Sequence, residues 1–292
     1  MSKVKVSQNV TKKSASNLAM AFVLLPKEKK DAMCALYAFC REVDDVADEE
    51  SVPVEDRRRE LARWREDIRK ACHGGTPDLP VNIELQPFIE RFKLPCELFE
   101  ALIDGMEMDL EGTYYETWDD LAKYCYHVAS VVGLLSIEIF EYTHPATKHY
   151  GYQIGQALQL TNILRDIRQD AKNKRIYVPR TLMEKHGVTE EDLYQFRDSQ
   201  NVRDMARELA ERARYHYAES SKCIHPDDRQ SLVASEMMGA VYWRILLKIE
   251  KSGYKVMRPS KFKLSKTGKL WLVARSFVRH WLHAKRSDYA FG

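Results

Sequence analysis

The sequence has little of what marks several large classes of protein. Its 292 residues include only 12 glycines and 10 prolines, with no G-x-G-x-x-G stretch or other glycine-rich phosphate loop, so no nucleotide-binding loop of these kinds is expected. Apolar and polar residues never alternate for more than a few positions, which disfavours β-strands. No apolar run approaches the roughly 18–20 residues that cross a membrane.

Cysteines are few and unpatterned. The six cysteines include no C-x-x-C pair and occur mostly in apolar segments with helical spacing, so we expect neither a disulfide framework nor a zinc site. We therefore expect the cysteines to be reduced thiols and the protein to be cytoplasmic. The apolar run at 18–25 follows two lysines but leads directly into Pro26 without a small-residue cleavage site, so no signal peptide is predicted.

Helical patterns cover almost the whole chain. Thr117 and Asp120 form a capping-box pattern, the strongest helix start. Helices are expected from Ser14 or Ser16 to Leu25, from Pro26 onward, and over residues 55–72, 84–92, 95–110, 118–142, 146–171, 190–223, 228–251 and 268–284. We therefore predict an all-α fold, organised as one helical domain over residues 1–292.

Charge is distributed unevenly. Of the 46 Lys/Arg, ten lie at 255–286, a stretch without Asp/Glu, which leaves 36 against all 43 acidic residues elsewhere. The basic C-terminal segment, about 255–292, predicts an amphipathic helix from the spacing of Leu270, Trp271, Ala274, Phe277, Val278 and Trp281. Peripheral contact with a membrane surface is one interpretation, and a helix that packs its tryptophans on the core is the other. No nucleic-acid partner is expected, because the tryptophans follow helical spacing.

Two acidic motifs share one spacing. DDVAD at 44–48 and DIRQD at 166–170 each place two aspartates four residues apart, in segments that otherwise resemble buried helices. Residues four apart lie on one helix face, about 6 Å apart along the axis, so each motif presents a double-carboxylate edge. Like charges at this spacing weaken a helix slightly, so a positive group should compensate them. One such motif alone is usually a solvated face, but two in apolar helices indicate a pair of cation sites.

Polar side chains accompany both motifs. They are Tyr37 and Arg41 for the first motif, and Gln159, Asn162, Arg165 and, farther along, Arg175 for the second. Carboxylate oxygens suit Mg²⁺, which keeps several waters and shares its ligands with substrate phosphates, while arginines bind phosphate oxygens through their forked donors. The pattern predicts a Mg²⁺–diphosphate site with one aspartate pair on each wall.

Three longer stretches carry a family resemblance. They are ALYAFCREVDDVADE at 35–49, YCYHVASVVGLLS at 124–136 and QLTNILRDIRQDAKNKRIYVP at 159–179. Together they resemble the squalene/phytoene synthase family, the head-to-head trans-isoprenyl diphosphate synthases. The resemblance implies the all-α isoprenoid synthase fold, a single bundle around a central apolar cavity with an aspartate-rich motif on each of two facing helices.

The resemblance also implies roles for individual residues. Two or three Mg²⁺ ions would bind with the substrate diphosphate at Asp44, Asp48, Asn162, Asp166 and Asp170. Diphosphate would be held by Arg41, Arg165 and Arg175. The entrance to the first prenyl site would be lined by Ser14, Ala15, Ser16, Asn17 and Tyr37. The prenyl chains would be bordered by Tyr124, Val128, Val132, Gln159 and Tyr242.

The chemistry of such enzymes explains these residue types. An allylic diphosphate ionises only if the departing charge is neutralised, which Mg²⁺ and arginines accomplish. The carbocation must then meet the C2–C3 double bond of a second prenyl diphosphate before water does, so a dry cavity is needed. Proton loss then closes a cyclopropane ring. Tyr124 is the candidate to assist this proton transfer, and the alternative is that it only forms part of the cavity wall.

Within the family, three features most resemble bacterial hopanoid-pathway members that join two farnesyl diphosphates into presqualene diphosphate: DDVAD, YCYHVASVVGLLS and LSKTGKLWL at 264–272. We expect the same reaction without NADPH, with later enzymes of squalene and hopanoid synthesis as candidate partners. The alternatives are a phytoene synthase acting on two geranylgeranyl diphosphates, an NADPH-dependent squalene synthase, or a non-catalytic assembly factor of this fold. Retention of the four outer aspartates disfavours the last.

The chain departs from the family pattern at two places. SASNL at 14–18 replaces a serine followed by an aromatic residue, and Arg168-Gln169 replaces a frequent Gly-Glu pair inside the second motif. Separately, the seven carboxylates between Asp104 and Asp120 predict a rim loop with flanking helix ends, where Asp109 is a candidate support for the metal site.

Overall fold

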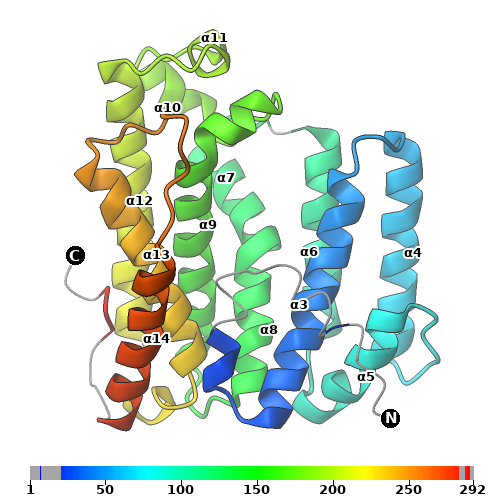
Figure 1. The fold of residues 1–292 in the computed structure, drawn as a ribbon. Coiled ribbons are helices and arrows are strands. Elements are labelled where there is room, and N and C mark those ends of the chain that lie inside the picture. Colours follow the sequence, from blue (N-terminus) through cyan, green and yellow to red (C-terminus); the bar gives the residue numbers. More distant parts are fainter. Residues whose placement is uncertain (1–6, 8–20, 113, 283–286, 290–292) are drawn as a thin grey trace.

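The chain folds into a bundle of helices (Figure 1). The computed structural model describes residues 7, 21–112, 114–282 and 287–289, and none of these is in a β-strand. The elements are η1 (Phe22–Leu24), α3 (Lys27–Asp48), α4 (Val54–Cys72), α5 (Pro80–Phe92), α6 (Cys96–Glu111), α7 (Trp118–Cys125), η2 (Tyr126–Ser130), α8 (Val131–Phe140), α9 (Thr147–Lys172), α10 (Arg180–Lys185), α11 (Glu190–Tyr194), α12 (Gln200–Cys223), η3 (Pro226–Asp228), α13 (Val233–Lys251) and α14 (Lys266–Trp281). The predicted all-α fold is confirmed. Over the described ranges, no helix combines the length and apolar character of a membrane span.

Most helix boundaries lie within two residues of the predicted ranges, but α5 begins at Pro80 instead of 84 and α13 at Val233 instead of 228. The predicted helix 118–142 is interrupted by the π-turn η2. The predicted helix 190–223 is two helices, because Phe196 adopts a positive φ of 55° and Ser199 starts α12 by accepting the Val202 N–H at 3.2 Å. The capping box of Thr117 and Asp120 is present at the start of α7.

One further difference concerns a short segment. Helix α10 is only six residues long and was not predicted, because periodicity needs several turns to be visible. The acidic stretch 104–120 includes two helix ends as predicted: α6 continues to Glu111, with Asp109 near its end, and α7 begins at Trp118.

Helix α9 is the central element and contacts α8, α12, α13 and η2 (Figure 1). Small residues allow its backbone to approach its neighbours closely. A Cβ atom on Gly133 of α8 would lie 2.4 Å from the Gly151 carbonyl oxygen, and one on Gly155 would lie 2.5 Å from Cα of Ser130 in η2. Larger side chains at these positions would push α8 and η2 away from α9.

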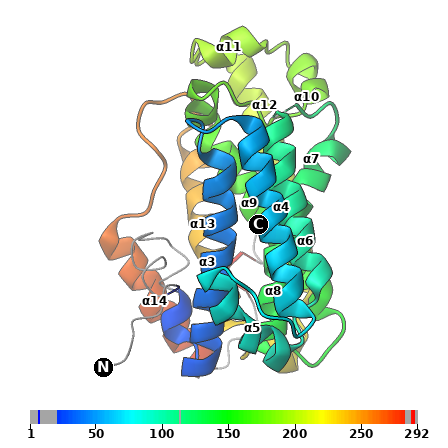
Figure 2. The ribbon, with the colours of Figure 1, turned by 90° about the vertical axis from the view of Figure 1, so that its right-hand side faces the viewer.

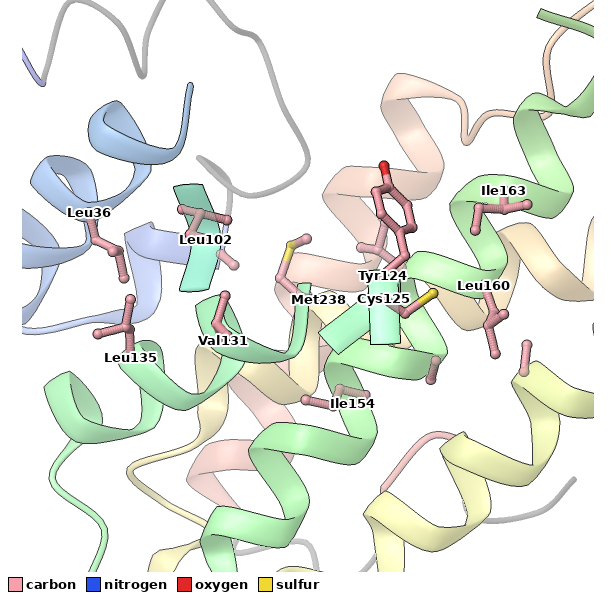
Figure 3. Packing of buried hydrophobic residues seen from close by; sticks show 14 of the residues in the cluster. Leu36, Leu102, Tyr124, Cys125, Val131, Leu135, Ile154, Leu160, Ile163 and Met238 are labelled. Atoms are coloured by element: carbon pink, nitrogen blue, oxygen red, sulfur yellow. The ribbon is translucent and has the colours of Figure 1, made fainter. Parts of the chain in front are cut away.

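One contiguous set of buried apolar side chains extends along the described chain from Ala21 to Tyr289. Figure 3 shows members of it from α3, α6, α7, α8, α9 and α13, among them Leu36, Leu102, Ile154 and Met238. Both α3 and α9 run from the lower to the upper end of the bundle in Figure 1, so their C-terminal ends lie at the same end of the molecule. This arrangement brings the two aspartate motifs together.

Helix α14 lies at the outside of the bundle and contacts α13 (Figures 1 and 2). It packs through Leu272, which is buried, whereas Trp271 is half exposed, with Arg244 and Arg275 stacked over its ring at 5.4 and 5.2 Å. The expectation that this helix packs its tryptophans on the core is therefore wrong for Trp271. The side chain of Trp281 lies outside the described part of the chain.

Candidate active site

A cavity of about 460 Å³ lies inside the bundle, within the size range of ligand pockets, about 300–1,000 Å³. Along α3 it extends from Met33 to Asp44, eleven positions or roughly 16 Å of helix. Apolar residues such as Phe22, Met33 and Phe140 form one end. The other end, beside Asp44, is polar. The space therefore suits a long apolar chain with a charged head group.

Nine of the residues predicted for the site line this cavity. They are Tyr37, Arg41, Asp44, Tyr124, Val128, Val132, Gln159, Asn162 and Tyr242. Five others belong to or adjoin the aspartate motifs without being among its lining residues: Asp48, Arg165, Asp166, Asp170 and Arg175. The remaining four, Ser14, Ala15, Ser16 and Asn17, lie outside the described residues, so their predicted role stays a prediction.

The first motif is held in place by Arg41, one turn earlier on α3. Its Nη1 lies 2.8 Å from Oδ2 of Asp44 and its Nη2 lies 2.5 Å from Oδ1 of Asp45. Burial, reinforced by the charge of Asp48, nevertheless raises the pKa of Asp44 to about 6. A carboxyl group with this pKa binds a cation well, because the cation relieves an unfavourable buried charge.

The second motif lies on the facing helix α9. Arg165 donates to Oδ2 of Asp166 from Nε at 3.1 Å, and Lys261, from the segment after α13, has its Nζ 3.7 Å from Oδ1 of the same aspartate. Burial and the neighbouring Asp166 raise the pKa of Asp170 to about 7. The two motifs are thus alike in electrostatics as well as in spacing.

Arg168, which replaces a frequent glycine inside the second motif, does not contact the motif's aspartates. Its Nη1 donates to the Met257 carbonyl oxygen at 2.7 Å, and its guanidinium stacks on Phe196 at 4.0 Å. Residue 168 is two positions past Asp166 and therefore about 200° around the helix. Its role is to fasten the segment after α13 to α9.

A chain turn carries Arg175 back across the site. Lys174 adopts a positive φ of 58°, and the Arg175 N–H donates to the Asp170 carbonyl oxygen at 2.9 Å. From this anchored position the Arg175 guanidinium reaches Asp48 on α3, with Nη1 2.7 Å from Oδ1. The arginine thereby connects the two walls.

A cluster of tyrosines surrounds Asp109 of α6. Tyr124 and Tyr177 each donate a hydroxyl hydrogen bond to its carboxylate at 3.1 Å, and Tyr115 packs against both rings. Burial raises the pKa of Asp109 to about 6 despite the two donors. Sequence reasoning did not find Tyr177, although it stands two residues after Arg175 in the third quoted stretch.

The π-turn η2 forms part of the cavity wall through Val128 and Ala129. It is held between α6 and α9, where a Cβ atom on Gly105 would lie 2.9 Å from Cγ1 of Val128. Single π-turns inside helices are frequent at functional sites. Here the turn positions Tyr124 and Val128 on the same cavity.

The donors present fit magnesium bound together with a diphosphate. Oδ1 of Asn162 and Oδ1 of Asp166 are buried without a hydrogen-bond partner, which is uncommon for polar atoms and favours an electropositive ligand. Among the side chains that the structure describes, no three His, Cys, Asp or Glu form a ready-made metal cluster. Mg²⁺ that is held largely by waters and phosphate oxygens requires only one or two carboxylates for each ion.

Residues 11–268 match the family of squalene/phytoene synthases. The chain is 38% identical over 268 residues to a presqualene diphosphate synthase of Zymomonas mobilis, covering 91% of each protein. It is 35% identical over 251 residues to a phytoene synthase of Mycobacterium tuberculosis, covering 85% of this chain and 82% of the relative.

Solved structures agree with these relatives. A dehydrosqualene synthase in complex with ligand superposes with a TM-score of 0.81 at 28% identity, over 93% of this chain and 94% of the other. A squalene synthase of Alicyclobacillus acidocaldarius superposes with a TM-score of 0.76 at 30% identity, over 85% and 93%. The fold is the all-α isoprenoid synthase fold that the resemblance implied. The chain belongs to the squalene/phytoene synthase family, and it is a prenyltransferase of the kind that condenses prenyl diphosphates head to head.

Proposed function

We propose that the enzyme condenses two farnesyl diphosphates into presqualene diphosphate, with Mg²⁺ and without NADPH. The relatives at 38% and 37% identity that carry this activity in their names support the choice of product. The observation that carries the proposal is the cavity, which is apolar over most of its length and ends between two acidic helix faces with unsatisfied oxygens on Asn162 and Asp166.

The proposed magnesium site uses the oxygens of the two motifs. Asp44 and Asp48 would hold Mg²⁺ on one wall, and Asn162, Asp166 and Asp170 on the other. Bound Mg²⁺ would supply positive charge to the departing diphosphate. Arg41, Arg165 and Arg175 stand beside these carboxylates and would bind the remaining phosphate oxygens.

The rest of the cavity serves the carbon chemistry. As the C1–O bond of one substrate breaks, its electrons leave with the diphosphate and an allylic cation remains. Apolar walls exclude water while the C2–C3 double bond of the second substrate attacks C1 of this cation. Loss of one proton from the new carbon skeleton then closes the cyclopropane. Tyr124 would assist that proton transfer, which is supported by its place in the cavity wall and its hydrogen bond to Asp109.

The alternative within the family is the same condensation of two C20 chains. The phytoene synthases at 35% identity favour it as the second candidate. The two proposals differ in the length of chain that the cavity accepts and share every charged residue of the site.

The test is to incubate purified protein with Mg²⁺ and either C15 or C20 prenyl diphosphate, with and without NADPH, and to identify the products by mass. We expect presqualene diphosphate from the C15 substrate alone. A C40 product from the C20 substrate alone would establish the alternative. Conversion of the C15 substrate only when NADPH is present would show that the enzyme needs the reductant.

A further inference from the structure

The outer side of α14 carries apolar side chains that the bundle leaves uncovered. Its four large members are 51–69% exposed, whereas Leu272, which packs toward α13, is 2% exposed. Spacing in steps of three and four aligns them along the helix. The members are Leu270, Trp271, Ala274 and Val278 of α14 and Leu282, one residue past its end, and together they are called the α14 face.

Cations border the α14 face. Arg244 and Arg275 stack on Trp271, and Lys269 directly precedes Leu270 on the same helix. The carboxylate of Asp288 pairs with Arg275 at 2.7 Å. An apolar stripe with a tryptophan, bordered by cations, suits the boundary between lipid head groups and acyl chains.

We propose that the α14 face docks on an anionic lipid bilayer, with the helix lying in the plane of the membrane surface. Cations near such a surface are attracted by acidic lipids, and the apolar side chains enter the acyl boundary. A second copy of this chain is a poorer occupant, because a symmetric contact would bring two sets of cations together.

If the proposed function holds, docking through α14 would bring the catalytic cavity close to the membrane. Ala234, Met238 and Tyr242 of α13 line the catalytic cavity, and α14 packs on that same helix. η1, which supplies Phe22 to the cavity, also contacts α13. A docked α14 would therefore hold the apolar part of the cavity one helix away from the lipid, where prenyl substrates and products partition.

The test is flotation of the full-length protein with vesicles of phosphatidylcholine alone or mixed with phosphatidylglycerol, without substrate. We expect binding to the anionic vesicles only, and Leu270→Ser with Val278→Ser should weaken it about tenfold or more. A vesicle-induced change in tryptophan emission should be smaller in Trp271→Phe. The matched control is Ile83→Ser on α5, whose side chain is 51% exposed and which should bind as the unsubstituted protein does.

The proposal would be overturned by no binding to anionic vesicles, or by equal binding of the double variant. Dimerisation in light scattering that the double variant loses would also overturn it and assign the face to a second copy. Failure of docking is distinguishable from failure of the proposed reaction, because product formation is measured on purified protein without vesicles.

Discussion

Arg175 and Asp48 join the two aspartate motifs across 127 residues, with Nη1 of the arginine 2.7 Å from Oδ1 of the aspartate. The backbone of Arg175 is fixed to the second motif through the Asp170 carbonyl oxygen, while its side chain reaches the first. The guanidinium therefore stands between two acidic helix faces, where a diphosphate with its Mg²⁺ ions is proposed to bind.

The first prediction concerns this arginine. Arg175→Gln should lower kcat/KM by about 10–100-fold, the effect of losing one hydrogen bond to a charged group. Arg175→Lys should recover only part of the activity, because it lacks the forked donors. Steady-state kinetics with Arg180→Gln is the control, since Arg180 pairs with Glu190 at 3.2 Å and does not line the cavity. Equal losses in the two glutamine variants would remove Arg175 from the diphosphate site.

Asp44 and its neighbour Asp45 offer a matched pair of substitutions. Both carboxylates contact Arg41, but only Asp44 lines the cavity. Asp44→Asn should reduce kcat by about 100-fold or more, because it would remove the charge of a proposed Mg²⁺ ligand. Asp45→Asn should stay within a few-fold of the unsubstituted enzyme. Circular dichroism of both variants verifies the helical fold, and retained activity in Asp44→Asn would exclude that residue as a ligand.

The raised pKa values of Asp44 (about 6) and Asp170 (about 7) predict how stability responds to pH and magnesium. Ordinary aspartates titrate near 3.9, so between about pH 4 and 7 the folded protein binds more protons than the unfolded chain, and these two groups lower its stability as pH rises. Above pH 7 their full cost is present. Cation binding offsets that cost.

Magnesium with inorganic diphosphate should therefore raise the thermal unfolding midpoint more at pH 8 than at pH 5.5, because at the lower pH the ligand must displace protons. Differential scanning fluorimetry measures both values. The same pair of measurements on Asp45→Asn should reproduce the difference. An increase that is the same at both pH values would contradict a role for these two carboxyl groups in binding.

Substitutions at Tyr124 and Tyr177 distinguish two roles: a hydrogen bond to Asp109, which both tyrosines make, and a catalytic role in the cavity, which is proposed for Tyr124. Each donates one hydrogen bond of 3.1 Å to that carboxylate, but only Tyr124 lines the cavity. If Tyr124 assists proton transfer, Tyr124→Phe should lower kcat by about 100-fold or more with little change in KM. Tyr177→Phe should have a much smaller effect. Similar kinetics in the two variants would assign Tyr124 to the wall alone.

The parts of the site that the sequence predicted are those that depend on local spacing or on quoted family motifs. Asp44 and Asp48 share a face because helical geometry places residues four apart on one side, and Tyr242 was found only through the resemblance. The contact of Tyr177 with Asp109 depends on how a turn after α9 returns to α6, which no local pattern contains. The π-turn at 126–130 differs from an α-helix by one residue in a turn, too little for periodicity to reveal.

Arg168 is a second residue whose role the sequence could not predict. The sequence shows that it lies inside the second motif. The contact that orients its side chain, the Met257 carbonyl oxygen, belongs to a segment about 90 residues later in the chain. The replacement of a Gly-Glu pair by Arg168 and Gln169 thus keeps both aspartates of the motif and adds an attachment between α9 and the segment after α13.

The final prediction concerns chain length. Phe22 belongs to the apolar end of the cavity, opposite Asp44, so Phe22→Ala should lengthen the space available to the prenyl chain. The ratio of C20 to C15 turnover should rise by about tenfold, the scale on which hydrophobic pockets discriminate chain size. Unfolding free energy should fall by roughly 3–5 kcal/mol, as for other Phe→Ala changes in protein cores. Phe39→Leu is the control, because Phe39 is buried against Phe99 with ring centroids 5.3 Å apart and does not line the cavity; it should cost stability without changing the ratio. An unchanged ratio in Phe22→Ala would show that another residue limits the chain.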